Sequence, residues 1–192
     1  MRNCFFCMIL LLTGCAGGPP PPEWQANASN ALKAFPQHDL SGNRKLAEIE
    51  FERAKAELRS TGRADLLARA ELLRCAVRVA SLEFDDCPGF EALRRDAGSE
   101  ELAYADYLAG RGDRAAEDDP LSKLVFAGIR LKKSQITPAE IAAAVEIASA
   151  QGWRRPLLAW LGVQEKRAEA AGDREALERI RRRIALIGAR PI

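Results

Sequence analysis

The sequence contains few of the residues on which enzyme chemistry most often depends. Among its 192 residues there is a single histidine, His38. A catalytic triad needs a histidine beside an activated serine or cysteine, and the chain has no G-x-S-x-G motif to supply the serine. It also lacks the G-x-x-x-x-G-K-S/T loop that cradles phosphates. We therefore expect no catalytic residues, and the sequence predicts a protein that is not an enzyme.

Soft metal ligands are equally scarce. A zinc site takes three or four such ligands, and beyond the first residues the chain offers only His38, Cys75 and Cys87. The two cysteines have a better use as a pair. Asp85-Asp86 and Asp118-Asp119 are acidic pairs that we expect to be solvated in loops rather than to hold a cation. We expect neither a metal nor another cofactor.

The sequence has no large excess of charge of either sign. Its 29 Lys and Arg against 27 Asp and Glu give a net charge of +2. This balance provides no electrostatic reason to expect nucleic acid as a partner. With 47% hydrophobic and 29% charged residues, the composition is typical of a globular domain with a sizeable core.

An apolar run near the start of the chain ends at a cysteine. Arg2 supplies a positive charge, residues 5–12 are mostly apolar, and the chain reads L-T-G-C up to Cys15. The run is too short to span a membrane, which takes about 20 apolar residues, but it is typical of a secretory signal. The L-T-G-C sequence resembles the lipobox of bacterial lipoproteins. The resemblance implies a signal peptide over 1–14, a lipidated Cys15 and therefore a membrane partner through the lipid anchor.

The residues after Cys15 are consistent with this address. In lipoproteins of double-membraned bacteria, an Asp after the cysteine favours the inner membrane. Ala16 stands here, so the resemblance implies an outer-membrane anchor facing the periplasm. Two glycines and four prolines follow, which makes 15–22 an extended tether and leaves 23–192 as the folded domain. The alternative is an ordinary signal peptide that happens to end near a cysteine.

Cys75 and Cys87 are the two cysteines of the folded domain. Because an oxidising periplasm favours disulfides, we predict that they are bonded to each other. The bridge closes only if the helix that carries Cys75 ends near Leu82 and the next residues turn straight back along it. The alternative is two separate thiols.

Every segment of the domain has apolar residues at helical rather than strand spacing, so the sequence predicts an all-α fold of roughly eight helices. Pro36 should end the first helix, Ser99 should be an N-cap, and Thr137 with Glu140 should form a capping box. Short connections favour antiparallel hairpins. The predicted helices cover approximately 24–35, 44–61, 64–82, 99–110, 120–133, 138–151, 156–171 and 177–187, with a short turn near 90–95.

One hairpin turn resembles a tetratricopeptide repeat. Gly42-Asn43 is followed by Ala47, Phe51 and Ala54, which match the turn and second helix of that repeat. The resemblance implies a superhelix of helical hairpins that binds other proteins. The chain departs from the family because no clean 34-residue period exists and Pro36 interrupts the first predicted helix. The alternative is an irregular helical bundle whose turns use glycine and a polar residue.

A candidate partner-binding site lies at Trp153, Arg154 and Arg155, since tryptophan and arginine are common in interface hot spots. The competing interpretation places Trp153 in the core between two helices. The last helix carries four arginines, for which we weigh contact with acidic partners or lipid headgroups against a simply solvated face: Arg179, Arg181, Arg182 and Arg183.

These observations favour an outer-membrane lipoprotein that binds proteins, as a scaffold, a pilotin-like factor or another assembly component of an envelope machine. The inference from helical hairpins to protein binding rests on analogy of fold. Two alternatives stay open: an enzyme that acts on peptidoglycan or lipid, and a carrier with a small-ligand cavity between helices.

Overall fold

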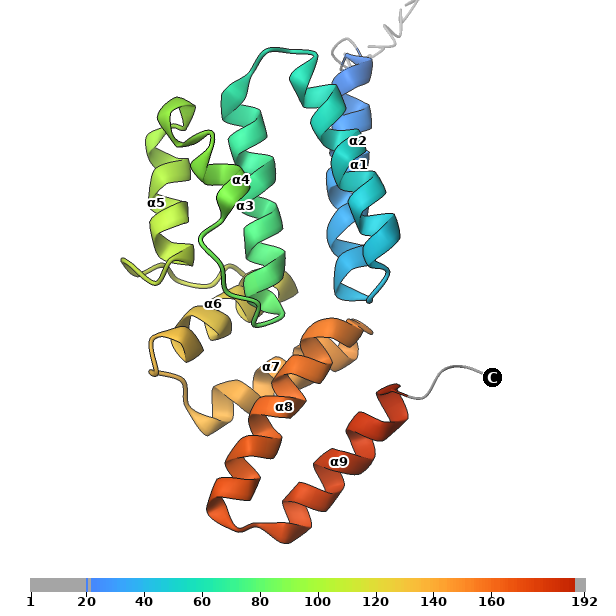
Figure 1. Ribbon diagram of the computed structural model, residues 1–192, viewed down its shortest axis with the longest axis vertical. Coiled ribbons are helices and arrows are strands. Elements are labelled where there is room, and N and C mark those ends of the chain that lie inside the picture. Colours follow the sequence, from blue (N-terminus) through green and yellow to red (C-terminus); the bar gives the residue numbers. More distant parts are fainter. Residues whose placement is uncertain (1–19, 21, 189–192) are drawn as a thin grey trace, which may run out of the picture.

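The computed structural model describes residues 20 and 22–188, and over this part of the chain the protein is all α-helical, without a β-strand (Figure 1). The predicted signal peptide, Cys15 and most of the predicted tether lie outside the described residues. The elements are α1 (Glu23–Leu40), α2 (Arg44–Arg59), α3 (Ala64–Ala80), α4 (Pro88–Glu91), the 3-10 turn η1 (Arg94–Asp96), α5 (Ser99–Leu108), α6 (Pro120–Lys132), α7 (Pro138–Ala150), α8 (Arg154–Ala171) and α9 (Arg174–Gly188).

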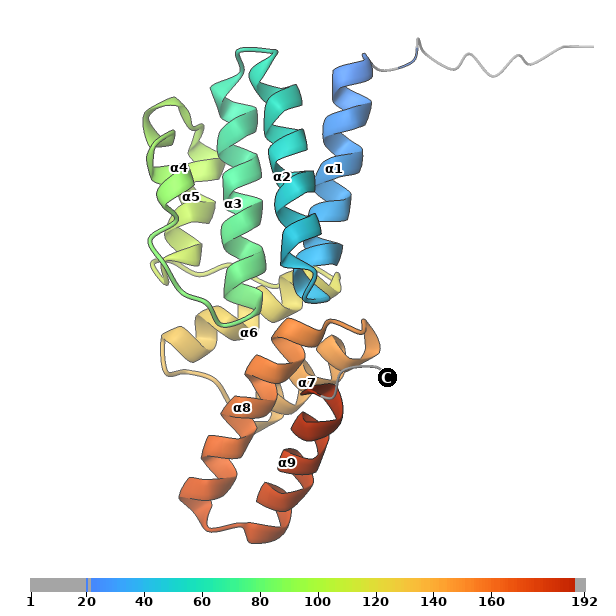
Figure 2. The ribbon, with the colours of Figure 1, turned by 45° about the vertical axis from the view of Figure 1, so that its right-hand side comes forward.

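The helices form two groups with α6 between them (Figures 1 and 2). α1, α2, α3 and α5 lie side by side in one group, and α7, α8 and α9 form the other. Short turns make α1–α2, α2–α3, α7–α8 and α8–α9 antiparallel hairpins. The all-α fold class and its hairpin arrangement are therefore as predicted, whereas membership in a repeat family stays a prediction.

Pro36 does not end the first helix, contrary to the prediction. It lies inside α1, which continues to Leu40. An interior proline removes one backbone hydrogen bond, but the extra turn buries Phe35, Pro36 and Leu40. Burying large apolar side chains stabilises by about 1.5–3 kcal/mol each, which offsets the lost hydrogen bond.

The structure confirms one of the two predicted N-terminal helix caps and contradicts the other. The capping box at α7 is confirmed, because the Thr137 hydroxyl accepts from the Glu140 amide at 3.2 Å and the Glu140 carboxylate accepts from the Thr137 amide at 2.7 Å. Ser99 is not the N-cap of α5. The carbonyl of Gly98 accepts the first helical bond from Leu102 at 3.0 Å, which places Ser99 inside the helix.

The core extends over most of the described helices, and part of it lies where the end of α3 meets α6 and α8. Trp160 of α8 is fully buried, and its indole Nε1 donates to the carbonyl of Ala80 at the end of α3, at 3.2 Å. α6 approaches the same end of α3 at Gly128. A Cβ placed on Gly128 would lie 2.7 Å from the carbonyl oxygen of Val79. The glycine thus lets the backbones of α3 and α6 lie closer together than any larger residue would allow.

Gly128→Ala should lower the free energy of unfolding by about 1–3 kcal/mol, because the added methyl group overpacks the contact between α3 and α6. Gly162→Ala is the matched control in α8, where an added Cβ meets nothing within 4 Å, and it should raise that free energy by up to about 1 kcal/mol through helix propensity. Urea unfolding followed by circular dichroism measures both. Equal effects of the two variants would contradict the close approach.

Candidate functional site

The predicted disulfide between Cys75 and Cys87 is present, with 5.7 Å between the two α-carbons. α3 ends at Ala80, and Leu82 adopts a left-handed backbone conformation with φ 59°. The amide of Glu83 then donates back to the carbonyl of Arg78 at 2.9 Å. This reversal returns the chain along α3 to Cys87, which is the geometry that the spacing of the cysteines required.

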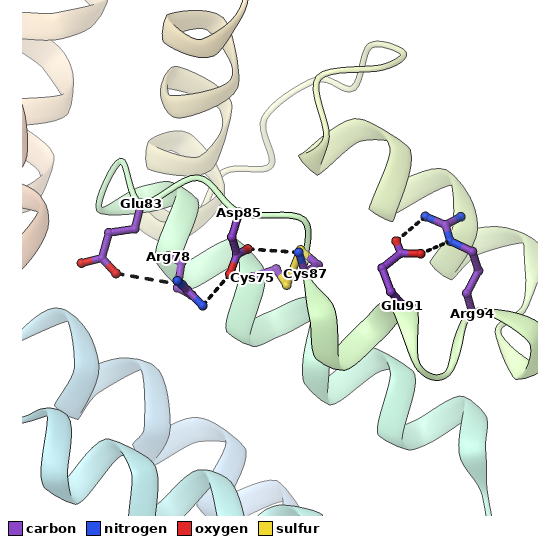
Figure 3. Close-up of a disulfide and its surroundings, with 7 residues drawn as sticks. All are labelled: Cys75, Arg78, Glu83, Asp85, Cys87, Glu91 and Arg94. Atoms are coloured by element: carbon purple, nitrogen blue, oxygen red, sulfur yellow. Dashed lines mark hydrogen bonds and ion pairs between the residues drawn. A yellow bond between two sulfur atoms is a disulfide. The ribbon is translucent and has the colours of Figure 1, made fainter.

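Asp85 fixes the returning loop (Figure 3). Its carboxylate accepts from the amide of Cys87 at 3.1 Å and pairs with the Arg78 guanidinium at 2.5 Å. Potential ligand atoms of Cys75, Asp85 and Cys87 lie within 4.8 Å of one another. In this structure the sulfurs are bonded to each other and Arg78 balances the carboxylate. The arrangement therefore serves the loop and does not fit a zinc site, which needs free thiolates.

A set of ion pairs, here called the charged junction, joins the two groups of helices. Arg155 of α8 pairs with Asp39 at the end of α1 and with Glu83 after α3, the latter at 2.5 Å. Glu83 also pairs with Arg44 of α2 at 2.7 Å. Arg155 is 13% exposed, and burial lowers its pKa, although guanidinium remains charged in proteins. The charged junction thus holds four helices together.

The structure separates the three residues of the candidate partner-binding site. Trp153 is 4% exposed and its indole Nε1 donates to Gln37 of α1 at 3.3 Å, so it lies in the core as the competing interpretation had it. Arg155 belongs to the charged junction. Arg154 is exposed at the first position of α8 and remains available to a partner. α8 begins two residues earlier than predicted, which brings Arg154 and Arg155 into the helix.

The arginines of the last helix lie on its surface and form ion pairs. Arg181 pairs with Glu165 of α8 at 2.7 Å, and Arg183 pairs with Glu146 of α7 at 3.3 Å. Arg179 and Arg182 pair with acidic residues one turn earlier on α9 itself. Because exposed ion pairs contribute little to stability, these guanidinium groups can exchange partners.

Two clefts with a largely apolar lining open between helices of the described structure. One, here called the α7–α9 cleft, has a volume of about 500 Å³ and is lined by residues of α7, α8 and α9, among them Ile141, Leu161 and Ile180. The other, here called the tyrosine cleft, has a volume of about 390 Å³ and lies against α3, α5 and the start of α6. Tyr104 and Tyr107 line it with apolar residues of α3. Burial raises the pKa of Tyr104 to about 12, so its hydroxyl stays protonated at neutral pH.

Replacing both Cys75 and Cys87 with Ala should lower the free energy of unfolding by about 3 kcal/mol, because the bridge closes a short loop in the unfolded chain. Reductant should destabilise the natural protein by the same amount and leave the double variant unchanged. Alkylation without reductant, followed by mass spectrometry, should modify neither cysteine. Modification of both in the folded protein would contradict the disulfide.

Arg155→Ala should lower the free energy of unfolding by about 3–5 kcal/mol, since it leaves the half-buried Asp39 carboxylate without its partner. The neighbouring Arg154→Ala is the matched control. Its side chain is exposed, so the free energy of unfolding should change by less than about 0.5 kcal/mol. Thermal and urea unfolding of the two variants measure the difference. Comparable stability of both would show that the charged junction does not hold the helices together.

Among the described residues, no helix combines the length and the apolar character needed to cross a membrane. Comparisons of the chain with protein-family models, with curated proteins and with solved structures found no match.

Proposed function

We propose that the protein is an outer-membrane lipoprotein that faces the periplasm and binds another protein as a scaffold or assembly factor. The proposed outer-membrane location is supported by the L-T-G-C sequence that ends at Cys15 behind an apolar run, and by the stretch of glycines and prolines after it. The disulfide between Cys75 and Cys87 agrees with an oxidising compartment. The tether would hold the helical domain away from the lipid surface.

The observation that carries the binding role is the α7–α9 cleft. Apolar side chains form its floor and arginines line it, which is the combination of apolar contact and charged rim found in protein interfaces. Hairpins of rigid helices hold this surface in a fixed shape, so a partner would bind with little ordering cost. Arg154 offers a second exposed position near the turn between α7 and α8.

A second candidate function is binding of a small ligand, and the tyrosine cleft favours it. Leu72 and Leu73 of α3 and Val125 of α6 supply apolar contacts. The protonated Tyr104 hydroxyl can donate a hydrogen bond to a ligand. Exposed charged residues also line this cleft, including Glu100 and Arg114. It is therefore an open surface hollow rather than the enclosed apolar cavity expected of a carrier. For an enzyme acting on peptidoglycan or lipid, no arrangement of the described residues offers comparable support.

Cys15→Ser tests the address and the binding role together. The natural chain should carry acyl groups and fractionate with the outer membrane, whereas the variant should lack both properties because it has no thiol to lipidate. In the same cells, photo-crosslinkers that replace Arg154 or Gln164 in the lipidated chain should become linked to a partner protein.

Each half of this proposal has its own contradicting outcome. Acylated Cys15→Ser protein in the outer membrane would overturn the lipobox interpretation. Lipid attachment without any protein captured from either crosslinker position would keep the address and overturn the scaffold.

A further inference from the structure

The α7–α9 cleft has a recessed apolar floor. Ile141 of α7 and Leu161 of α8 lie at its base with 1% and 0% of their surface exposed. Ala168 of α8 and Ile180 of α9 continue the apolar surface toward the turn between these helices. A volume of about 500 Å³ admits several side chains of a partner segment but not a flat surface.

The charged residues that line this cleft are all arginines. Arg167, Arg179 and Arg183 line the cleft, and no acidic residue does so among the residues that line it in the described structure. Arg179 and Arg183 pair with Glu175 and Glu146, whose side chains are 86% and 73% exposed, and Arg183 also donates a hydrogen bond to Ser149 at 3.0 Å. Such exposed pairs are weak. Within residues 22–188, no ion pair involves Arg167.

From this combination we propose that the α7–α9 cleft binds an acidic amphipathic segment of the partner protein. Apolar side chains on one face of that segment fill the floor over Ile141 and Leu161. Its carboxylates pair with the guanidinium groups of Arg167, Arg179 and Arg183, which offer the planar pair of donors that matches a carboxylate. This inference rests on the proposed protein-binding function and names the chemistry of the partner.

A bilayer surface is the less favourable occupant. Anionic headgroups could pair with the outward arginines Arg181 and Arg182, which are 55% and 68% exposed. A flat membrane cannot reach Ile141 and Leu161 at the base of the cleft, because three helices surround them. An amphipathic segment reaches both the floor and the rim, as helices do in apolar grooves.

Binding is measured with the mature lipidated chain in vesicles of phosphatidylcholine, using fluorescence anisotropy of a labelled helical peptide with leucines on one face and glutamates on the other. This peptide should bind at least about tenfold more tightly than its twin with lysines in place of glutamates, and less tightly as salt rises. Equal affinity for the two peptides would overturn the proposal.

Charge reversal locates the binding surface. The double variant Arg167→Glu with Arg183→Glu should weaken binding of the acidic peptide by about tenfold or more. Arg182→Glu, on the same helix but outside the cleft, should change it by less than about twofold. Circular dichroism melting of each variant confirms folding. Unchanged binding by a folded double variant would overturn the assignment, as would an equal loss with Arg182→Glu.

Crosslinking separates the remaining outcomes. In cells, a photo-crosslinker at Gln164, which lines the cleft, should capture a protein segment rich in Asp, Glu and apolar residues. Capture from Arg154 alone would overturn the cleft and keep the scaffold, and capture from neither position would overturn both. Capture of phosphatidylglycerol by Gln164, in vesicles that contain it, with no competition from the acidic peptide, would assign the cleft to a membrane and overturn the proposal.

Discussion

The chain reverses direction at the end of α3, and the packing of α6 and α8 against the first helices relies on this turn. Val79 meets Gly128 of α6, and the carbonyl of Ala80 accepts the hydrogen bond of Trp160. Glu83 then enters the charged junction with Arg155. Two other helices, α6 and α8, thus pack against fewer than two turns of chain. The disulfide between Cys75 and Cys87 ties the end of the loop after α3 back to α3 and so restricts the conformations of this turn. The position of α8, which packs on the turn, therefore depends on a covalently closed loop.

The stabilising interactions at this point differ in kind. The contacts around Gly128 and Trp160 are close packing, which weakens when the atoms move apart by a fraction of an ångström. The charged junction stabilises through pairing that offsets the desolvation of Arg155 and Asp39. These interactions fix the position of α8. Because α7 and α9 both pack on α8, the same interactions also fix the position of the α7–α9 cleft. The proposed binding surface is therefore oriented by contacts at the centre of the molecule.

The arginines show how differently one residue type is used. Arg155 is partly buried between Asp39 of α1 and Glu83 after α3, and it has a structural role. Arg181 and Arg182 form exposed pairs on the surface. Arg167 lines an apolar cleft beside other arginines. The net charge of +2 does not reveal that the charged lining of this cleft is all positive, because acidic residues outside the cleft, Glu146 and Glu175 among them, balance it.

Three local features could be predicted from the residue pattern: the helical periodicity, the capping box at Thr137 and the turn that lets Cys87 reach Cys75. These depend on neighbours within one or two turns, so the chain carries their signals directly. The place of Pro36 inside α1 depends on packing between helices, since burial of Phe35 and Leu40 overrides the local preference of proline to end a helix. Likewise, Arg155 meets Asp39 across 116 positions and Glu83 across 72. The α7–α9 cleft also joins residues from three helices. No local pattern encodes such meetings, because they arise from how the helices pack.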